Sequence, residues 1–520
     1  MAALASAVLF ALAFPPFSLI VPIFCCLVPL AATVGRFADG GEPRAGAARI
    51  GFWFAIVGFG ANLYWIGVAL MLFTQLAWAG YVATVLCLGG IYAAAAALLW
   101  AARRRTGWPM AVLLPPIWVA SEMLLVHLGD IAFPWLPLGL GVATNPHLAQ
   151  LADLSGVHGL SLWIAIINGL LADVVLAWRT RRLEAMGRLG AAVAAVVLLW
   201  AYGNFRLMTT RVRPVAPIAA VQPNVPEDEK MQAALRSRFM GIMMSATREG
   251  LARDSAKGDP PALIVWPEVA LPDYLQQRPD WADSLRSLAA VTHAPLVFGI
   301  LDVTFNTARD YDIFNAAMVA DASGNVGGQA AYHKRYLVPI VERVPFVNPK
   351  WFDGMKYFGA FGRGGRPVPF RFRFGSAGVL ICYESIFADL ARTYRLEGAD
   401  ILLNITNDAW FGETSAPYQH SAHLRLRAIE NRVGIVRAAN TGITEYVDPL
   451  GRVHGPTQLG VEAVRTYNAE TTDVRTLYDR WGDWAGWLSV ATTVAFALAY
   501  WAAASQMRAS MNVASKSASS

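Results

Sequence analysis

Long apolar segments fill the first two hundred residues of the chain and return once near its C-terminus. A helix needs about 17 to 25 apolar residues to cross roughly 30 Å of hydrocarbon. Six segments meet this requirement: Ile50–Phe73, Ala77–Ala101, Pro109–His127, Leu160–Trp178, Leu189–Phe205 and Trp484–Ala503. The first 35 residues are also apolar, but Pro15 and Pro16 interrupt them, so we expect two short helices there. The pattern predicts a multi-pass α-helical membrane bundle of about eight spans.

The segment from about Val212 to Asp483 has a different pattern, in which short aliphatic runs alternate with polar stretches. The runs read as buried strands at Ala216–Val221, Ala262–Val265, Pro295–Gly299, Ala316–Ala320, Gly378–Cys382, Ile401–Ile405 and Gly434–Ala438. Helical periodicity appears between them, at Lys230–Arg253, Trp281–Val291, Phe387–Glu397 and Gln419–Asn431. Such alternation predicts a layered α/β domain with one large core.

Composition and charge agree with this division and add an orientation. The chain is 55% hydrophobic and only 15% charged, which is too apolar for an ordinary soluble protein. Arginines fill every second loop: Arg36, Arg44 and Arg49; Arg103, Arg104 and Arg105; Arg179, Arg181, Arg182 and Arg188. Positive loops stay in the cytoplasm. We therefore expect cytoplasmic termini and an extracytoplasmic domain, and the net charge of +6 requires no nucleic acid partner.

These patterns divide the chain into four parts. We expect an N-terminal transmembrane bundle of about seven helices at 1–205, a catalytic domain at 206–483, a C-terminal transmembrane helix at 484–504 and a cytoplasmic tail at 505–520. A cleaved signal peptide is disfavoured, because the first residues lack a basic region and the apolar pattern continues past any cleavage site. The Ser-rich tail after Gln506 has the composition of a disordered segment.

Cysteine usage points to one residue. Cys25, Cys26 and Cys87 lie in predicted membrane helices, and only Cys382 lies in the α/β domain, so a disulfide framework is not expected. A free cysteine is often only a small buried hydrophobe. Cys382, however, ends an apolar strand just before a turn and a predicted helix, a position that exposes a side chain and favours its thiolate. It is therefore a candidate nucleophile.

A cysteine nucleophile needs a base for its proton and a donor that stabilises the oxyanion. Glu268 ends the apolar run Ile264-Val265-Trp266-Pro267-Glu268, so a strand delivers a carboxylate to its C-terminal edge. Lys334 lies in a basic and aromatic loop that precedes a second carboxylate, Glu342. Taken singly, each charge reads as a solvated surface residue. Together they predict a base and a cationic oxyanion clamp.

The three residues and their neighbours resemble the Glu-Lys-Cys triad of the nitrilase superfamily. The spacings of 334 − 268 = 66 and 382 − 334 = 48 residues are similar to those of one branch, the apolipoprotein N-acyltransferases. Further segments resemble that branch: Phe133-Pro134-Trp135, Val221-Gln222-Pro223-Asn224, Leu337-Val338-Pro339, Glu342-Arg343-Val344-Pro345-Phe346 and Asn407-Asp408-Ala409-Trp410-Phe411-Gly412. The resemblance covers nearly the whole chain, including the membrane bundle that soluble nitrilases lack.

The resemblance implies an αββα sandwich on the periplasmic side of a bacterial inner membrane, and a two-step acyl transfer without a cofactor. Cys382 would take the sn-1 acyl chain of a phospholipid such as phosphatidylethanolamine as a thioester, with Glu268 as base and Lys334 at the oxyanion. The α-amino group of an S-diacylglyceryl-cysteine apolipoprotein would then accept the chain, which gives ping-pong kinetics. Glu342 would support the site or its lid. Tyr383 and Glu384 would line the pocket.

Two alternatives stay open. A membrane-anchored amidase or nitrilase would pass the thioester to water, unless apolar aromatics such as Trp351-Phe352 and Trp410-Phe411 cover the site and exclude water. A transporter or scaffold that kept the fold and lost catalysis is disfavoured by the intact triad.

Four further residues have their own readings. His420 and His423 lie on one predicted helix face, but no further ligands with metal spacing accompany them, so no metal is expected. Glu122 inside a predicted span favours an interhelical polar contact. Met231 departs from the family, which commonly has Trp there, and leaves substrate gating at that arm open.

Overall fold

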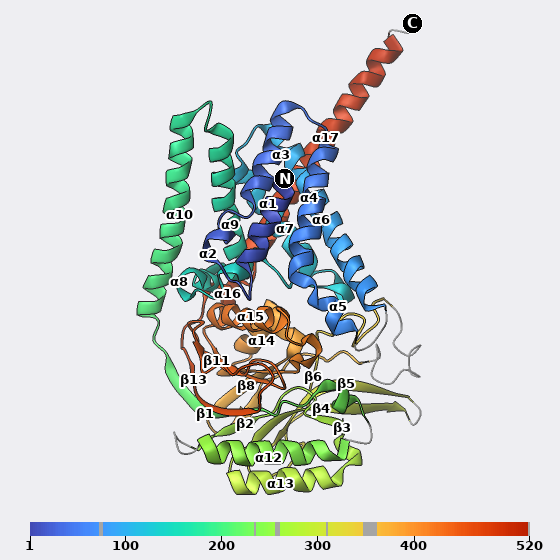
Figure 1. Ribbon diagram of the computed structural model, residues 1–520, viewed down its shortest axis with the longest axis vertical. Coiled ribbons are helices and arrows are strands. Elements are labelled where there is room, and N and C mark those ends of the chain that lie inside the picture. The colour runs from blue at the N-terminus through green and yellow to red at the C-terminus, as the bar shows by residue number, and fades with distance from the viewer. Residues whose placement is uncertain (72–75, 233–235, 255–259, 308–309, 347–360, 518–520) are drawn as a thin grey trace.

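The computed structural model describes residues 1–520 except 72–75, 233–235, 255–259, 308–309, 347–360 and 518–520. The described chain forms two regions, a bundle of long helices and an α/β domain that lies below it in Figure 1. The N-terminus lies within the bundle, and the last helix runs through the bundle and projects beyond it. The α/β domain is therefore an insertion between two helices of the bundle.

The bundle agrees in outline with the apolar pattern. Its helices are α1 (Ala2–Ala13), α2 (Ile20–Ile23), α3 (Val28–Gly40), α4 (Arg44–Leu63), α5 (Trp65–Leu70), α6 (Ala77–Thr106), α7 (Met110–Val126), α9 (Ala152–Ala177), α10 (Arg182–Thr209) and α17 (Trp484–Ser517). The helical break at Pro15 and Pro16 is confirmed, since α1 ends at Ala13. Within the described residues, five helices have the length and composition of a membrane span and three shorter apolar helices accompany them. The number of eight spans stays a prediction.

Several predicted helix boundaries are wrong. The helix predicted at Leu189–Phe205 extends over Arg182–Thr209, and the helix predicted at Lys230–Arg253 is two helices, Glu227–Met231 and Arg236–Asp254. The segment predicted as Ile50–Phe73 begins at Arg44 and is divided into α4 and α5 at Tyr64. The segment predicted to start at Leu160 begins at Ala152, because Gly156 adopts a φ of 68° and carries the chain through a kink where a Cβ atom would meet the ring of Tyr478. The tail expected to be disordered after Gln506 continues α17 to Ser517, in a segment that lacks glycine and proline.

The α/β domain contains two sheets packed face to face. The first has the order β13 (Ala463–Thr471), β1 (Arg213–Gln222), β2 (Leu263–Val265), β4 (Leu296–Thr307), β5 (Asp310–Ala320) and β6 (Tyr332–His333), with β3 (Leu271–Tyr274) beside β4. The second has the order β12 (Val453–His454), β11 (Glu445–Val447), β10 (Gly434–Ala439), β9 (Ile401–Thr406), β8 (Gly375–Ile381) and β7 (Phe370–Phe372). All seven predicted strands are present. The sequence patterns miss the others, most of which are only two to four residues long.

Helices cover the outer face of each sheet. α12 (Arg236–Asp254) and α13 (Pro279–Thr292) lie on the first sheet at the end of the molecule farthest from the bundle, and α14 (Ala388–Leu396) and α15 (Ala416–Asn431) lie between the second sheet and the bundle (Figure 1). The short helices α11 (Glu227–Met231) and α16 (Leu477–Trp481) complete the domain. The layers therefore follow the order helix, sheet, sheet, helix. Aliphatic side chains of both sheets, among them Ile218, Val379 and Leu403, form the buried core between them.

Helix α15 joins the domain to the bundle through buried polar contacts. The side-chain oxygen of Gln419 accepts hydrogen bonds from the indole nitrogens of Trp65 (3.1 Å) and Trp135 (2.8 Å). The guanidinium of Arg432, just beyond α15, donates to Asp153 of α9 at 2.6 Å, and Glu430 accepts from the backbone of Val157 at 2.9 Å. Because buried polar groups are costly unless paired, these contacts fix the domain against the bundle.

Candidate active site

Cys382 lies at a sharp turn between a strand and a helical segment. β8 ends at Ile381, and Cys382 begins a short 3-10 helix, Cys382–Ile386, with a φ of 50°. This left-handed backbone is strained for a residue with a side chain and is characteristic of functional turns. The predicted strand end at Cys382 is therefore one residue too long. The turn directs the thiol out of the sheet toward a cavity that Cys382 lines.

The other two residues of the predicted triad form one buried ionic cluster with Glu342. Lys334 is only 1% exposed, and its ammonium donates to Glu268 Oε1 at 3.0 Å and to Glu342 Oε1 at 2.9 Å. The second oxygen of Glu342 accepts from the backbone of Val338 at 2.8 Å. Glu268, Lys334, Glu342 and Cys382 all line the same cavity. With Tyr383, which lines this cavity too, the structure brings together five of the six residues singled out in the sequence.

Two asparagines complete this cluster and are not among the residues singled out individually in the sequence. Asn315 Nδ2 donates to Glu268 at 2.7 Å and to Glu342 at 3.0 Å, so it joins the two carboxylates. The backbone nitrogen of Asn407 donates to Glu268 Oε2 at 3.0 Å. With these contacts both oxygens of Glu268 are held in place. A carboxylate held this way has a fixed direction from which to take a proton.

The electrostatics of the cluster set the resting protonation states. Burial raises the pKa of the Cys382 thiol, the Glu268 carboxylate raises it further, and the nearby Lys334 opposes them only in part. Cys382 therefore rests as a thiol, contrary to the expectation that the turn favours a thiolate. Burial disfavours the charged form of Lys334, but Glu268 and Glu342 outweigh it and hold the pKa of that ammonium well above its ordinary value. Activation of Cys382 thus requires a base, and Lys334 stays a cation.

Glu384 lies behind the nucleophile and holds its turn. Its carboxylate is fully buried and accepts hydrogen bonds from Tyr332 Oη (2.7 Å) and from the backbone nitrogens of Arg335 (2.6 Å) and Ile381 (2.7 Å). The first two donors flank Lys334, and the third precedes Cys382. Glu384 thus connects the lysine loop to the nucleophile turn, whereas Tyr383 lines the cavity itself. This differs from the expectation that both residues line the pocket.

Because Glu384 connects these two segments, we expect its substitution to affect both stability and the reactivity of Cys382. In Glu384→Gln the side-chain amide places donor hydrogens against surrounding donors, so we expect a loss of about 2 kcal/mol in stability and slower alkylation of Cys382 by iodoacetamide. Thermal unfolding of the detergent-solubilised chain and intact-protein mass spectrometry measure the two effects. Glu249→Gln on the exposed face of α12 is the matched control and should leave both unchanged. An unaltered Glu384→Gln protein would contradict the connecting role.

A second buried network lies beside the nucleophile turn. His420 Nε2 is 3.0 Å from the carbonyl oxygen of Cys382, and its Nδ1 is 3.1 Å from Asp408 Oδ1. Arg437 donates to the other oxygen of Asp408 at 2.5 Å. The Arg437 guanidinium and His420 overcome the effect of burial and hold the pKa of Asp408 below its usual range. His423 lies elsewhere, with Nε2 2.9 Å from the carbonyl oxygen of Trp135, so these two histidines have separate structural roles.

The cavity that these residues line extends from the thiol to the membrane bundle. Its volume is about 590 Å³. Its charged lining residues all belong to the α/β domain, whereas Thr84, Cys87 and Leu88 of α6 line the part within the bundle. Most of the remaining lining is aliphatic or aromatic. A cavity of this shape accommodates a long apolar chain whose polar end meets Cys382.

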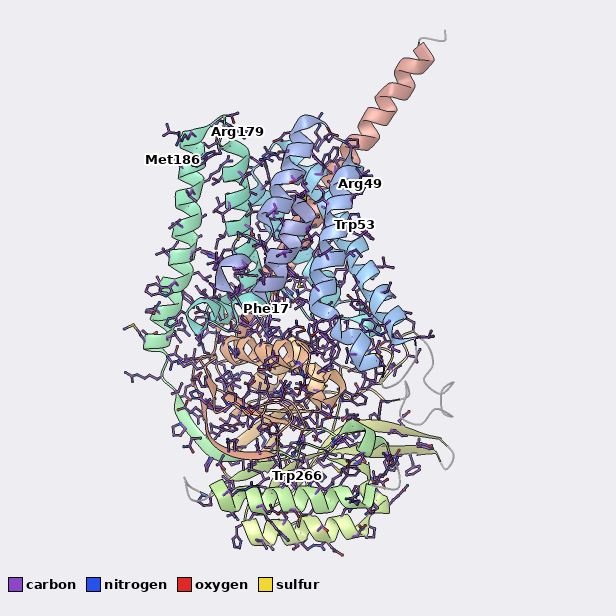
Figure 2. All side chains as sticks on the ribbon, viewed as in Figure 1. Phe17, Arg49, Trp53, Arg179, Met186 and Trp266 are labelled. Atoms are coloured by element: carbon purple, nitrogen blue, oxygen red, sulfur yellow. The ribbon has the colours of Figure 1, made fainter. Side chains whose placement is uncertain are left out.

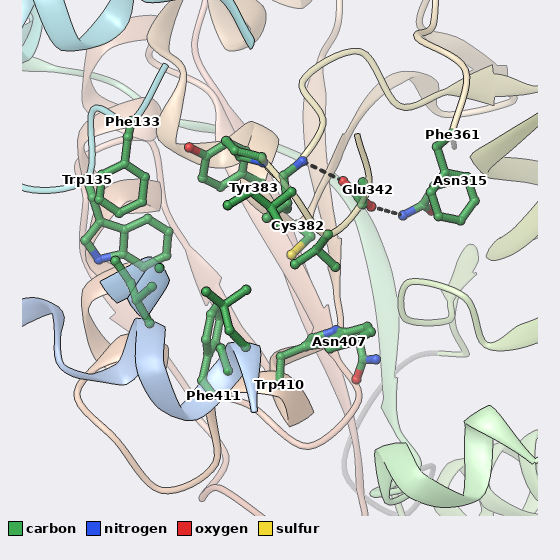
Figure 3. Close-up of a pocket in the computed structure, with 18 of the residues that line it drawn as sticks. Phe133, Trp135, Asn315, Glu342, Phe361, Cys382, Tyr383, Asn407, Trp410 and Phe411 are labelled. Carbon is green, nitrogen blue, oxygen red and sulfur yellow. Dashed lines mark hydrogen bonds between the residues drawn. The ribbon is translucent and has the colours of Figure 1, made fainter. Parts of the chain in front are cut away.

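Aromatic side chains form one wall of this cavity. Figure 3 shows Phe133 and Trp135 on one side of Cys382, Tyr383 between them and the thiol, and Trp410 and Phe411 below. Phe133 and Trp135 are stacked with their ring centroids 5.7 Å apart, and the hydroxyl of Tyr383 donates to the carbonyl oxygen of Ala132 at 2.7 Å. Phe133 and Trp135, from the N-terminal region, thus form this wall together with Tyr383, Trp410 and Phe411 of the α/β domain.

Four other residues named in the sequence remain to be placed. Trp351 and Phe352 lie outside the described residues, and the side chain of Met231 lies outside them too. Glu122 makes the expected polar contact between elements, because its carboxylate accepts from Trp118 Nε1 and from the backbone of Leu138, both at 2.7 Å.

Comparisons with known proteins agree with both halves of the chain. The family model for carbon-nitrogen hydrolases matches residues 217–476, and the model for the apolipoprotein N-acyltransferase N-terminal domain matches residues 6–170. The apolipoprotein N-acyltransferase of Geobacter metallireducens is 33% identical over 511 residues, which cover 96% of this chain and 94% of that protein. That of Agrobacterium fabrum is 31% identical over 478 residues, covering 87% of this chain and 86% of that protein.

A solved structure is similar to the α/β domain. The amidase from Nesterenkonia sp. is 21% identical and covers 53% of this chain and 97% of its own, with a TM-score of 0.38. The two family models and the full-length relatives carry the assignment. The chain belongs to the apolipoprotein N-acyltransferase family, the membrane-bound acyltransferases of the nitrilase superfamily.

Proposed function

We propose that this enzyme moves the sn-1 acyl chain of a phospholipid to the α-amino group of an S-diacylglyceryl-cysteine apolipoprotein, through a thioester at Cys382. The observation that carries the proposal is the cavity, which joins the Cys382 thiol and its ionic cluster to an apolar channel that reaches α6. A soluble amide would need no such channel. An acyl chain drawn from the bilayer needs one, because leaving hydrocarbon costs about 0.8 kcal/mol per methylene group.

In the first half-reaction Glu268 takes the proton of the Cys382 thiol as the sulfur attacks the ester carbonyl. The ammonium of Lys334 stabilises the oxyanion that forms. When the tetrahedral intermediate collapses, the C–O bond to the glycerol breaks, and the leaving alkoxide receives the proton from Glu268. The products are an S-acyl cysteine and a lysophospholipid, which leaves the cavity. Phosphatidylethanolamine is the donor we expect, and the cycle uses no cofactor.

In the second half-reaction the free α-amino group of the apolipoprotein attacks the thioester carbonyl. Glu268 accepts a proton from the nitrogen, and Lys334 again stabilises the oxyanion. The C–S bond breaks, the amide forms, and the thiolate of Cys382 recovers a proton from Glu268. Glu342 and Asn315 keep Lys334 and Glu268 aligned through both steps, as their hydrogen bonds support. Donor and acceptor occupy the site in turn, which gives ping-pong kinetics.

The family places the enzyme in the bacterial inner membrane, and we infer that the α/β domain faces the periplasm with both termini in the cytoplasm. Figure 2 shows Arg49 and Arg179 at the end of the bundle farthest from the α/β domain. Arg103 lies in the last turn of α6, where it pairs with Asp39 of α3 at 2.8 Å. Because arginine-rich ends stay in the cytoplasm, this distribution supports the orientation.

Positionally labelled donors test this proposal. Wild-type enzyme in phospholipid vesicles, given a diacylated lipopeptide, should produce one N-acylated lipopeptide for each lysophospholipid released. A label in the sn-1 chain should appear in the product, and a label in the sn-2 chain should stay in the lysophospholipid. Free fatty acid formed at the same rate with or without lipopeptide would favour the membrane-anchored amidase or hydrolase instead.

A further inference from the structure

Lys230 is a buried cation that the catalytic cluster does not use. It lies in α11, is only 6% exposed and lines the active-site cavity. Its Nζ has no hydrogen-bond partner among the residues that the structure describes. An ammonium buried without partners costs several kcal/mol, so such a group is uncommon unless a ligand completes it. Burial accordingly lowers the pKa of Lys230, although the carboxylates of Glu227 and Glu268 oppose the shift.

Lys334, a second cation that lines the cavity, already has two carboxylate partners, Glu268 and Glu342. Glu227 and Glu268 are connected in turn through Asn407, whose side chain donates to Glu227 at 2.6 Å while its backbone nitrogen donates to Glu268. The same two carboxylates act on Lys230 electrostatically, so its ammonium lies on the Glu268 side of the cavity. An anionic group of the substrate is the missing partner.

We propose that Lys230 binds the phosphate of the acyl-donor phospholipid. The assignment rests on the proposed function and deepens it by naming the group that recognises the donor. In a phospholipid the phosphate is attached to the same glycerol as the sn-1 ester, so a lipid whose ester carbonyl meets Cys382 keeps its phosphate near the inner end of the cavity. The diacylglyceryl-cysteine acceptor carries no phosphate. Lys230 should therefore act in the first half-reaction and not in the second.

The test compares two acyl donors in Lys230→Met and Lys230→Arg proteins. One donor is phosphatidylethanolamine, and the other is p-nitrophenyl palmitate, which carries an acyl ester without a phosphate. For Lys230→Met we expect kcat/KM of thioester formation from the phospholipid to fall about 10- to 100-fold, mainly through KM, because a charge-assisted hydrogen bond is lost. The rate from p-nitrophenyl palmitate should be unchanged. Lys230→Arg, which keeps a cation, should recover most of the phospholipid rate.

Two further readouts separate this role from folding and from the proposed function. The melting temperature of Lys230→Met should not fall, because the substitution removes a buried charge without a partner. Transfer from a thioester preloaded with p-nitrophenyl palmitate to a diacylated lipopeptide should proceed at the wild-type rate. If wild-type enzyme forms no thioester from either donor, the proposed function fails, whatever Lys230 does.

Three outcomes would overturn the assignment to the donor phosphate. An equal loss with both donors would make Lys230 part of the acylation chemistry. An unchanged rate with both donors would leave it without a role in donor binding. If inorganic phosphate competes with the phospholipid in wild type, and Lys230→Met abolishes that competition, Lys230 belongs to a site for free phosphate. The proposal instead predicts that inorganic phosphate leaves the rates with both donors unchanged.

Discussion

The Cys382→Ala enzyme should form no acyl adduct when it is incubated with phosphatidylethanolamine, and its transferase rate should fall about 10⁶-fold, as when the nucleophile of another covalent enzyme is removed. The physical reason is that, among the described residues that line the cavity, no other cysteine lies beside the base. Cys87 is the matched control, because it also lines the cavity but lies on α6 in the bundle. Intact-protein mass spectrometry with hydroxylamine cleavage detects the thioester.

The Cys87→Ala enzyme should keep the adduct and a rate within a few-fold of wild type. An adduct that survives in Cys382→Ala and disappears in Cys87→Ala would move the nucleophile into the bundle. Retention of full transferase activity in Cys382→Ala would revive the alternative in which the α/β domain kept the fold and lost catalysis.

The Glu268→Gln enzyme should acylate Cys382 about 10² to 10⁴ times more slowly, the range that general-base catalysis contributes. The same substitution should speed alkylation of Cys382 by iodoacetamide between pH 7 and 8.5. Burial raises the pKa of this thiol first, and the Glu268 carboxylate raises it further, so removal of that negative charge lowers the pKa and increases the thiolate fraction at a given pH. Slower acylation together with faster alkylation would show that Glu268 acts as a base and does not merely change the pKa of the thiol.

A parallel fall in acylation and alkylation would instead indicate that the site has collapsed, because Glu268 also accepts hydrogen bonds from Lys334, Asn315 and Asn407. Stopped-flow acylation with p-nitrophenyl palmitate and the pH profile of alkylation give the two rates. The melting temperature of the variant distinguishes loss of structure from loss of the base.

The sequence predicts two members of the triad because each follows a recognisable apolar run. Strand ends at Val265 and Ile381 deliver Glu268 and Cys382 to one edge of the sandwich, as the patterns lead us to expect. Lys334 follows β6, a strand of only two residues that no periodicity reveals, so its prediction rests on the basic and aromatic loop around it and on the resemblance. Residues that follow a clear apolar run can therefore be predicted from the pattern, whereas a strand of only two residues is too short to produce one.

The sequence does not predict the support around the triad. Asn315 lies one residue before the predicted strand Ala316–Ala320, and nothing local shows that it pairs two carboxylates from other segments. Asn407 belongs to a segment that resembles the family, so the resemblance could have identified it as a site residue. Lys230 reads as the start of an ordinary helix, because its burial depends on contacts with distant segments. Long-range packing decides these positions, and a single sequence does not contain it explicitly.

The same reason explains the errors in the bundle. Apolar runs give the approximate positions of the spans but not their ends, because a kink at Gly156 and an interruption of the helix at Tyr64 fall within continuous apolar sequence. Residues 129–149 carry the Phe133-Pro134-Trp135 segment and form only short helical turns, yet they supply the aromatic wall of the active site. These residues reach the active site only because the bundle packs against the α/β domain, and the apolar pattern does not reveal that contact.

The most direct test of acyl transfer through Cys382 is a single-turnover chase. Wild-type enzyme is loaded with phosphatidylethanolamine, freed of excess lipid and divided among a diacylated lipopeptide, the same lipopeptide with an acetylated N-terminus, and buffer. We predict that the Cys382 adduct disappears rapidly only with the free amine, and that this lipopeptide gains the mass of one acyl chain. Loss of the adduct at one common rate in all three samples, with release of free fatty acid, would contradict the account.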